Sequence, residues 1–370
     1  MALTRIQPPA IADVREPNFR NIVINGDMAV SQRGTSFASN GYTLDRWTMD
    51  ESTDGAVTVT QDTDVPAGSE FATSLKIDCT TADASIGAAQ YAAMVMFFEG
   101  QNFQYLKYGT SSAQSLTLSF WVKAVKTGIY CIRFVKEAGS GTRYETPIEY
   151  TISSASTWEK KTIILTPTAG STTFIQNSDG AIANNNSAGF RVGFTLAAGS
   201  NFHSTNDTWV AGSDKMSTSS QVNGLDSTSN NFWLTGVQLE AGSVATDFEV
   251  VPFDQNLERC ERYYYMVGDE DEQGLGSAFY RSSSNVRFIV LPPVTMRATP
   301  SLDQSTASNS FRVLSSGGGD DLLDDWTILA SSTDKFIICV NSTDASGTAG
   351  EAGYALINLA STHFALVAEL

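Results

Sequence analysis

The chain has 370 residues, of which 42% are hydrophobic and 17% charged, and its 40 acidic and 23 basic residues give a formal net charge of −17. This length suggests two or three domains, and the apolar fraction is large enough to build buried cores. The acidity leaves no basic excess for phosphate contacts, so nucleic-acid binding is disfavoured. The four cysteines lie far apart, which disfavours a structural zinc site and is typical of buried free thiols made in a reducing cytosol.

Residues 1–20 predict an extended arm. Pro8, Pro9 and Pro17 interrupt any regular helix or central strand. The segment lacks the apolar core of a signal peptide, and no run in the chain approaches the length of a membrane span. Its apolar residues need another surface to dock on, and the alternative is a disordered tail. The candidate docking residues are Leu3, Ile6, Ile11 and Val14.

Residues 21–253 predict a β domain. The clearest strand is 114–125, where Leu116, Leu118 and Phe120 alternate with polar residues. Strands of this length, separated by Gly, Ser and Asn turns, predict an antiparallel sandwich or barrel. Residues 88–100 are too densely apolar to decide between helix and strand. The other expected strands are 21–25, 56–61, 129–136, 142–152, 158–166, 189–196, 231–239 and 246–251, with long polar loops at 177–187 and 199–229.

A short helix is predicted over 254–266, capped by Asp254, with Leu257, Cys260 and Tyr264 on one face. Strands then return in a second, smaller β domain that covers 254–370 together with the helix. The chain ends on an apolar strand, which we expect to be buried in this domain or against a partner chain. The expected strands are 277–280, 285–291, 325–331, 335–341, 354–359 and 364–368.

Known catalytic motifs are missing from the sequence. The two histidines, His203 and His363, have no nucleophile in a motif arrangement beside them, and GxSxG, HExxH, Walker and GxGxxG patterns do not occur. We therefore expect a protein that is not an enzyme. The acidic runs at 269–272 and 320–325 do not fit an EF-hand and are interpreted as solvated loops. No cofactor or metal ion is predicted.

Carbohydrate binding is a more specific hypothesis than catalysis or metal binding. Proteins hold sugars with aromatic rings and with side chains that bond to hydroxyls. Aromatic residues in polar segments suit this function, and the alternative for each is packing in a core, where large aromatic rings usually lie. The candidates are Tyr105 and Tyr108 in one segment, Trp209 with Asn206 in the long loop, and Tyr280 and Trp326 in the second domain. Trp121 and Trp233, inside apolar strands, are predicted to be core residues.

Several short motifs together resemble bacteriophage tail-fibre proteins. Residues 21–28 (NIVINGDM), 32–34 and 45–47 are similar to the opening of a tail-fibre module, and 232–249 to its last strands. Residues 258–264 are similar to the segment that follows it. Residues 294–300 and 368–370 resemble the carboxyl-terminal domain of the family. One departure is Asp247, where the family often has Pro.

The resemblance implies a jelly-roll sandwich similar to carbohydrate-binding modules, followed by a small β domain. It also implies a homotrimeric tail fibre or spike of the virion, assembled in the host cytoplasm, that recognises a bacterial surface receptor such as a glycan. The arm would then dock on other tail proteins of the virion. Arg259, Arg262 and Tyr264 are predicted to pack at an interdomain or intersubunit interface. The alternatives are a fibre-borne polysaccharide depolymerase and a purely structural head fibre, collar or adaptor.

Overall fold

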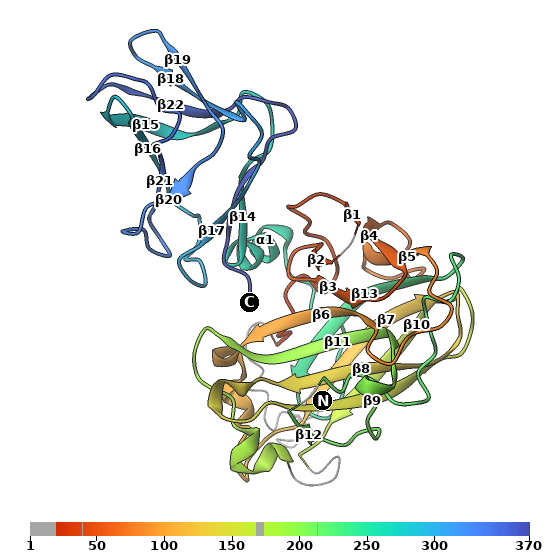
Figure 1. Cartoon of the computed structure of the whole chain (residues 1–370). Helices are drawn as coiled ribbons and strands as arrows, with labels where there is room; N and C mark the ends of the chain where they lie inside the picture. The colour runs from red at the N-terminus through yellow and green to blue at the C-terminus, as the bar shows by residue number, and fades with distance from the viewer. Residues whose placement is uncertain (1–19, 39, 168–173, 213) are drawn as a thin grey trace, which may run out of the picture.

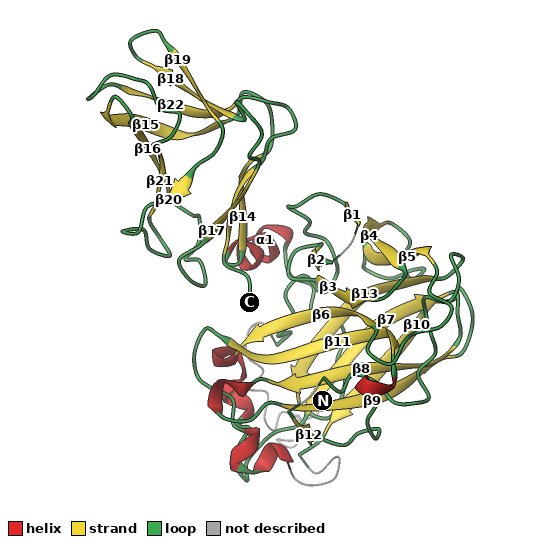
Figure 2. Ribbon diagram, in the orientation of Figure 1, coloured by secondary structure: helices red, strands yellow, loops and turns green. Residues whose placement is uncertain are grey.

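The computed structural model describes residues 20–38, 40–167, 174–212 and 214–370 (Figure 1). The predicted arm, with Leu3, Ile6, Ile11 and Val14, lies outside the described residues. Strands dominate both halves of the chain, and the one α-helix among the described residues stands between them (Figure 2). The predicted all-β class is therefore confirmed. No helix in the described ranges is long and apolar enough to cross a membrane.

The first half is a jelly-roll type of sandwich, called the first sandwich below, made of two antiparallel sheets. One has the strand order β1-β4-β5-β13-β7-β10, and the other β12-β9-β8-β11-β6-β3-β2. The strands are β1 (Ser36–Ala38), β2 (Gly41–Tyr42), β3 (Thr48–Ser52), β4 (Ala56–Asp62), β5 (Ser74–Thr81), β6 (Tyr91–Glu99), β7 (Leu116–Ala124), β8 (Gly128–Lys136), β9 (Tyr144–Ile152), β10 (Glu159–Leu165), β11 (Ala188–Ala198), β12 (Val210–Ala211) and β13 (Asn231–Ala241).

The core of the first sandwich follows from alternation along its central strands. On β7, Leu118, Phe120 and Val122 are fully buried between the sheets. The Phe120 ring meets Phe194 of β11 edge to face, with ring centroids 5.1 Å apart. The apolar segment that sequence left undecided is strand β6, which pairs with β11 on one side and β3 on the other. Side chains on both faces of β6 are buried, with Ala93 and Val95 as well covered as Met94 and Met96, and this explains why its apolar pattern is nearly continuous.

The second half, called the second sandwich, packs a three-stranded sheet (β14-β23-β17) against a seven-stranded sheet (β19-β18-β22-β15-β16-β21-β20). Its core is built around Phe288, Phe311, Trp326 and Phe364. The elements are α1 (Phe253–Glu261), β14 (Tyr264–Gly268), β15 (Gly274–Ser282), β16 (Asn285–Val290), β17 (Ser301–Gln304), β18 (Phe311–Ser315), β19 (Asp320–Leu323), β20 (Thr327–Ile328), β21 (Ile337–Asn341), β22 (Ala352–Ile357) and β23 (Phe364–Val367). The apolar terminal strand, β23, is buried between β14 and β17.

Several local predictions are wrong. Residues 21–25 and 246–251 form no strand, because several of their backbone N–H groups donate to side chains instead of to a ladder. Val23 donates to Asn21 of its own segment, and Thr246 and Glu249 donate to side chains of β13. The helix ends at Glu261, and Tyr264 begins strand β14. Asp254 does not cap it, since Pro252 occupies the cap position. Trp121 and Trp233 are half-buried on the outer face of their sheet rather than in the core.

Candidate functional site

Segments that are far apart in the sequence meet where the two sandwiches contact each other. The Asn21 carboxamide oxygen accepts hydrogen bonds from the backbone N–H groups of Val23 and Leu239, both at 3.0 Å. Its amide group donates to the Val237 carbonyl at 3.1 Å. One side chain therefore fixes the start of the first sandwich to its last strand, β13.

Asn25 links the following turn to helix α1. Its backbone is left-handed (φ 59°), a conformation that asparagine tolerates better than most residues. Its side chain donates to the carbonyls of Val30 and Asp45 at 2.8 and 3.0 Å, and its backbone N–H donates to the Asn256 side chain at 3.1 Å. The motif at 21–28 thus determines where α1 lies on the first sandwich.

A buried network of charged and aromatic groups joins the two sandwiches. Arg46, which is 2% exposed, and Arg33 both pair with the Glu369 carboxylate, Arg33 at 3.2 Å. The Arg46 guanidinium lies 3.5 Å from the centre of the Tyr263 ring, and that of Arg33 lies 3.6 Å from the centre of the Tyr264 ring. The cations come from the first sandwich and their partners from the second, so electrostatics hold the two together.

Glu99, at the end of β6, forms the floor of a cleft beside this network. Its fully buried carboxylate accepts hydrogen bonds from Arg262 Nε and Nη2 at 2.7 and 2.8 Å and from the Tyr263 hydroxyl at 2.5 Å. These bonds raise the pKa of Arg262, because the carboxylate stabilises the charged guanidinium. Gln101 donates to the same carboxylate at 2.7 Å. All these groups hold one another in place.

One wall of the cleft is the 3₁₀ helix η2 (Gly100–Leu106). A 3₁₀ helix has three residues per turn, so residues three apart share an edge. Phe103 and Leu106 therefore point into the core, while Asn102 and Tyr105 lie together on the side that lines the cleft. Tyr105 is 38% exposed, and partial burial together with the charge of Glu240 raises its pKa to about 12.

The opposite wall is helix α1 and the residue that follows it. Gln255, Glu258, Arg259 and Arg262 all line the cleft, and their spacing of three or four residues places them on one face of an α-helix. The cleft has a volume of about 600 Å³ and is completed by the segment that begins at Asn21. In the described part of the chain, the Tyr105 hydroxyl and the side-chain amides of Asn102 and Gln255 make no hydrogen bond, so these groups are available to a ligand.

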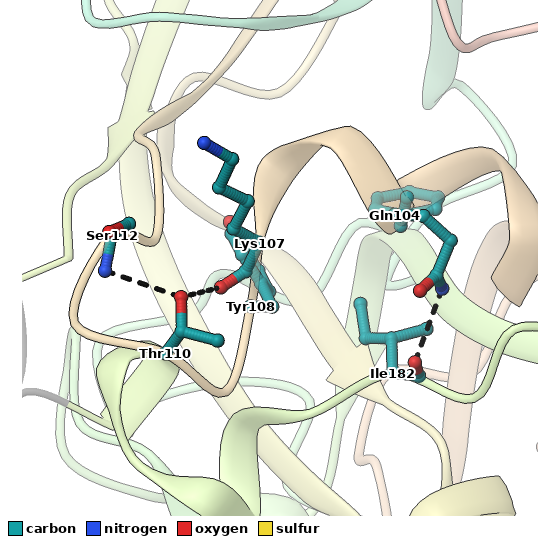
Figure 3. Close-up of a pocket in the computed structure, with 7 residues that line it drawn as sticks. Gln104, Lys107, Tyr108, Thr110, Ser112 and Ile182 are labelled. Carbon is teal, nitrogen blue, oxygen red and sulfur yellow. Dashed lines mark hydrogen bonds between the residues drawn. The ribbon is translucent and has the colours of Figure 1, made fainter.

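A second hollow, of about 450 Å³, borders the same 3₁₀ helix (Figure 3). Figure 3 shows the Gln104 amide bonded to the Ile182 carbonyl, at 3.2 Å, and the Thr110 hydroxyl bonded to the Lys107 carbonyl, at 2.8 Å. Tyr108 is only 7% exposed. The hollow presents backbone-bound polar groups and no exposed ring, so it suits a sugar less well than the Tyr105 cleft.

Of the predicted sugar-binding rings, only Tyr105 presents a face to solvent. Tyr108, Trp209, Tyr280 and Trp326 are buried, and rings in these positions cannot stack on a sugar. Three of them contact other residues of the interior. The Trp209 ring stacks on the Phe174 ring, with centroids 4.6 Å apart, the Tyr280 hydroxyl donates to Asp321 at 2.9 Å, and Trp326 packs against Phe288. Asn206 is exposed, and its side chain accepts the backbone N–H of Glu149 at 2.9 Å.

The structure brings Tyr105 together with Arg259 and Arg262, two residues that sequence assigned to an interface. Arg259 donates to the Asn21 carbonyl at 3.2 Å, and Tyr264 donates to Asp303 at 3.2 Å. Sequence reasoning missed Asn102, Gln255 and Glu258. The helical spacing of 255, 258, 259 and 262 was a readable signal for a polar face, but nothing in the sequence showed that η2 lies opposite it.

A half-buried cluster of tryptophans was also missed. On the outer face of the six-stranded sheet, Lys123 lies 4.0 Å from the centre of the Trp233 ring and 5.3 Å from that of Trp158. The Trp158 and Trp233 indoles donate to Asp64 and Asp62 at 3.0 and 3.2 Å. Because these groups bond to one another, the cluster stabilises the sheet surface and leaves few groups for a ligand.

The described ranges show no candidate metal site. No group of three or more His, Cys, Asp or Glu side chains there is arranged to hold an ion. The four cysteines, Cys79, Cys131, Cys260 and Cys339, are buried and form no disulfide.

No protein-family model matches the chain, and no curated protein matches it. Among solved structures, the enzymatically active domain of tailspike protein 4 from bacteriophage CBA120 is 14% identical, over 60% of this chain and 22% of that one, with a TM-score of 0.34. A family 11 carbohydrate-binding module from Clostridium thermocellum, bound to a mixed-linked tetrasaccharide, is 13% identical over 59% of this chain and 99% of the module, with a TM-score of 0.27.

The tandem of two family 22 modules from Paenibacillus barcinonensis Xyn10C is 10% identical over 90% of this chain and 97% of the tandem, with a TM-score of 0.28. All three likenesses are weak. At such low identities and TM-scores they carry no argument about what the chain binds.

Proposed function

We propose that this chain is a glycan-recognition component of a bacteriophage tail fibre and that the Tyr105 cleft binds a bacterial surface glycan. One observation carries the proposal: an exposed aromatic ring stands at a cleft of about 600 Å³ that is lined mostly by polar residues, and this volume is typical of ligand sites. The C–H face of a pyranose packs on an aromatic ring, and its hydroxyls bond to amide and guanidinium groups. The cleft offers both an aromatic ring and amide and guanidinium groups.

Each wall has a separate role in this proposal. The Tyr105 ring supports the sugar from the η2 side, and the free amides of Asn102 and Gln255 bond to hydroxyls from opposite sides. Glu99 is fully engaged by Arg262 and Tyr263, so it fixes the floor of the cleft. We expect binding without catalysis, because both oxygens of this carboxylate are already engaged by other side chains of the protein.

The rest of the proposal extends the resemblance to tail fibres. The protein would be assembled in the host cytoplasm, form a homotrimer in the virion, and attach to other tail proteins through the arm. The low charged fraction and the two β-sandwiches in series suit an elongated surface protein that binds neutral polymers. These statements concern the virion, so they are tested by looking for the protein, its oligomeric state and its neighbours in purified virus particles.

The glycan proposal is tested with soluble oligosaccharides prepared from bacterial lipopolysaccharide and capsule, titrated calorimetrically into the full chain. Tyr105→Ala should weaken binding at least about tenfold, since a stacked ring contributes roughly 0.5–1.5 kcal/mol beyond its buried area. Tyr105→Phe keeps the ring and should retain most of the affinity. Gln255→Ala should cause a smaller loss.

Tyr354→Ala is the matched control, because Tyr354 is an exposed tyrosine of the second sandwich (64%) that does not line the cleft. Short oligosaccharides bind one site each, so assembly of the protein does not alter the result. Equal affinities of wild type and Tyr105→Ala would refute the cleft as the glycan site. Shortened products after incubation would favour a depolymerase, and no binding to any glycan or host cell would favour a structural virion protein.

A further inference from the structure

The outer face of the seven-stranded sheet in the second sandwich carries large exposed apolar side chains among polar ones. Along β22, β15 and β16, one set of alternate residues fills the core, and the other set points outward. The outward set includes Tyr354, Phe279 and Ile289, whose exposed fractions are 64%, 42% and 38%. Polar residues normally occupy this position on a half-buried sheet, so the pattern is unusual.

The exposed apolar residues are contiguous across the strands. Leu314 of β18 lies opposite Tyr354 of β22, and Tyr354 lies opposite Ser277 of β15. On the other side of β15, Ile289 of β16 lies opposite Ile338 of β21. Since opposite residues on one face of a sheet are in contact, these side chains form a stripe across the sheet that is apolar except at Ser277, with Leu314 and Ile338 half-buried.

None of the described residues outside this sheet is seen to cover the stripe. The strands β15, β16, β18 and β22 lie farther from the first sandwich than β14, β17 and α1 do (Figure 1). Leu322 on the neighbouring strand β19 is also 43% exposed. A contiguous apolar patch left in water marks an interaction surface, because covering it releases about 25 cal/mol per Å².

The charges beside the stripe indicate what covers it. Arg287, on β16, has no acidic partner in the described part of the chain, and its Nε donates only to the Asn285 side chain at 3.0 Å. Asp320, on β19 at the other side of the sheet, is 54% exposed and lies 3.8 Å from Arg312. On this side two carboxylates, Asp320 and Glu272, share the single cation Arg312, so its net charge is negative, while Arg287 makes the β16 side basic. The face is therefore complementary to itself.

We propose that a second copy of this chain covers the outer face of this sheet. In a closed ring of copies whose faces turn inward, the β16 side of one copy meets the β19 side of the next. The register places Asp320 and Arg287 two residues apart along the strand direction, about 7 Å, which an arginine side chain spans. The proposal rests on the assembly part of the proposed function and is independent of its glycan part.

Sedimentation velocity of the full chain over a wide range of concentrations tests this. The wild type should form a closed oligomer. Tyr354→Asp combined with Ile289→Asp should raise the dissociation constant at least about a hundredfold. Val244→Asp is the matched control, since Val244 is an apolar residue of the first half of the chain that is 71% exposed. Both variants should melt like the wild type at a concentration where all are monomeric, because none of these side chains is buried.

A charge exchange tests the orientation. Arg287→Asp and Asp320→Arg should each weaken association, and the double variant should restore it, because the two positions meet between copies. A wild type that stays monomeric at every concentration overturns the inference, as does an oligomer unaffected by the aspartates on the stripe. A monomer that still binds oligosaccharides overturns this inference alone and leaves the glycan site standing.

Discussion

Asp45 shows how a single buried residue makes stability depend on pH. Its carboxylate is 1% exposed, and burial raises its pKa to about 6, against the lowering effects of hydrogen bonds from Gln32 and the charge of Arg33. The unfolded chain has the ordinary value near 3.8. Between these two values the folded protein holds a proton that the unfolded chain has lost, so stability falls as the pH rises through this window.

We therefore expect Asp45→Asn to gain stability relative to wild type as the pH rises from 4 to 7. The gain should be about 3 kcal/mol across the window, because the asparagine has no charge to bury. Urea unfolding of both proteins at several pH values measures the difference directly. Other titrating groups cancel in this comparison, and a difference that does not change with pH would contradict the assigned cause.

At the scale of elements, Gly26 sets how closely the first segment approaches strand β13. The backbone N–H of Val237 donates to the Gly26 carbonyl at 2.9 Å. A Cβ atom added at Gly26 would lie 2.1 Å from the Val237 carbonyl oxygen, far inside contact distance. Gly26→Ala must push the segment off the strand, and we expect a loss of about 3 kcal/mol of unfolding free energy.

Gly193→Ala, in β11, is the matched control for Gly26→Ala. Its added Cβ meets no atom closer than 3.6 Å, an ordinary contact. Urea unfolding should show the loss only for Gly26→Ala. Equal stabilities of the two variants would mean that the segment is not held at this distance.

How far the elements could be predicted depended on how long their apolar pattern is. Strand β7 was found within a few residues because apolar and polar residues alternate along most of it, although the structure buries both sets. Strands β5 and β18 also alternate, but they were missed because each brings only two or three large apolar residues to the core, too short a pattern to stand out. In the candidate site, Tyr105 was singled out, but Gln255 was not. The cleft depends on the contact of η2 with α1, and sequence alone does not show long-range contacts.

At the scale of the whole molecule, the motifs that resemble tail fibres converge on one place. Residues 21–28 bond to β13 and α1, and the terminal motif at 368–370 meets the motif at 45–47 through Arg46 and Glu369. The Tyr42 hydroxyl donates to the Leu370 carbonyl at 2.8 Å, and Arg297 donates to that of Ala368 at 2.6 Å. Short motifs scattered along the chain are therefore parts of a single interface, which explains why they occur together.

This interface predicts that the two sandwiches unfold together. Glu369→Ala leaves Arg46 buried without its carboxylate, and breaking a buried pair in this way costs about 3–5 kcal/mol. Because the lost contacts lie between the sandwiches, calorimetry should show the second sandwich unfolding at a lower temperature and apart from the first. Glu272→Ala is the control: Glu272 is 58% exposed and pairs with Arg312 inside the second sandwich, so its loss should cost less than about 1 kcal/mol and leave the transitions together. If the sandwiches remain coupled in Glu369→Ala, the other contacts between them, such as the Glu99–Arg262 pair and the hydrogen bond from Asn25 to Asn256, are enough to join them.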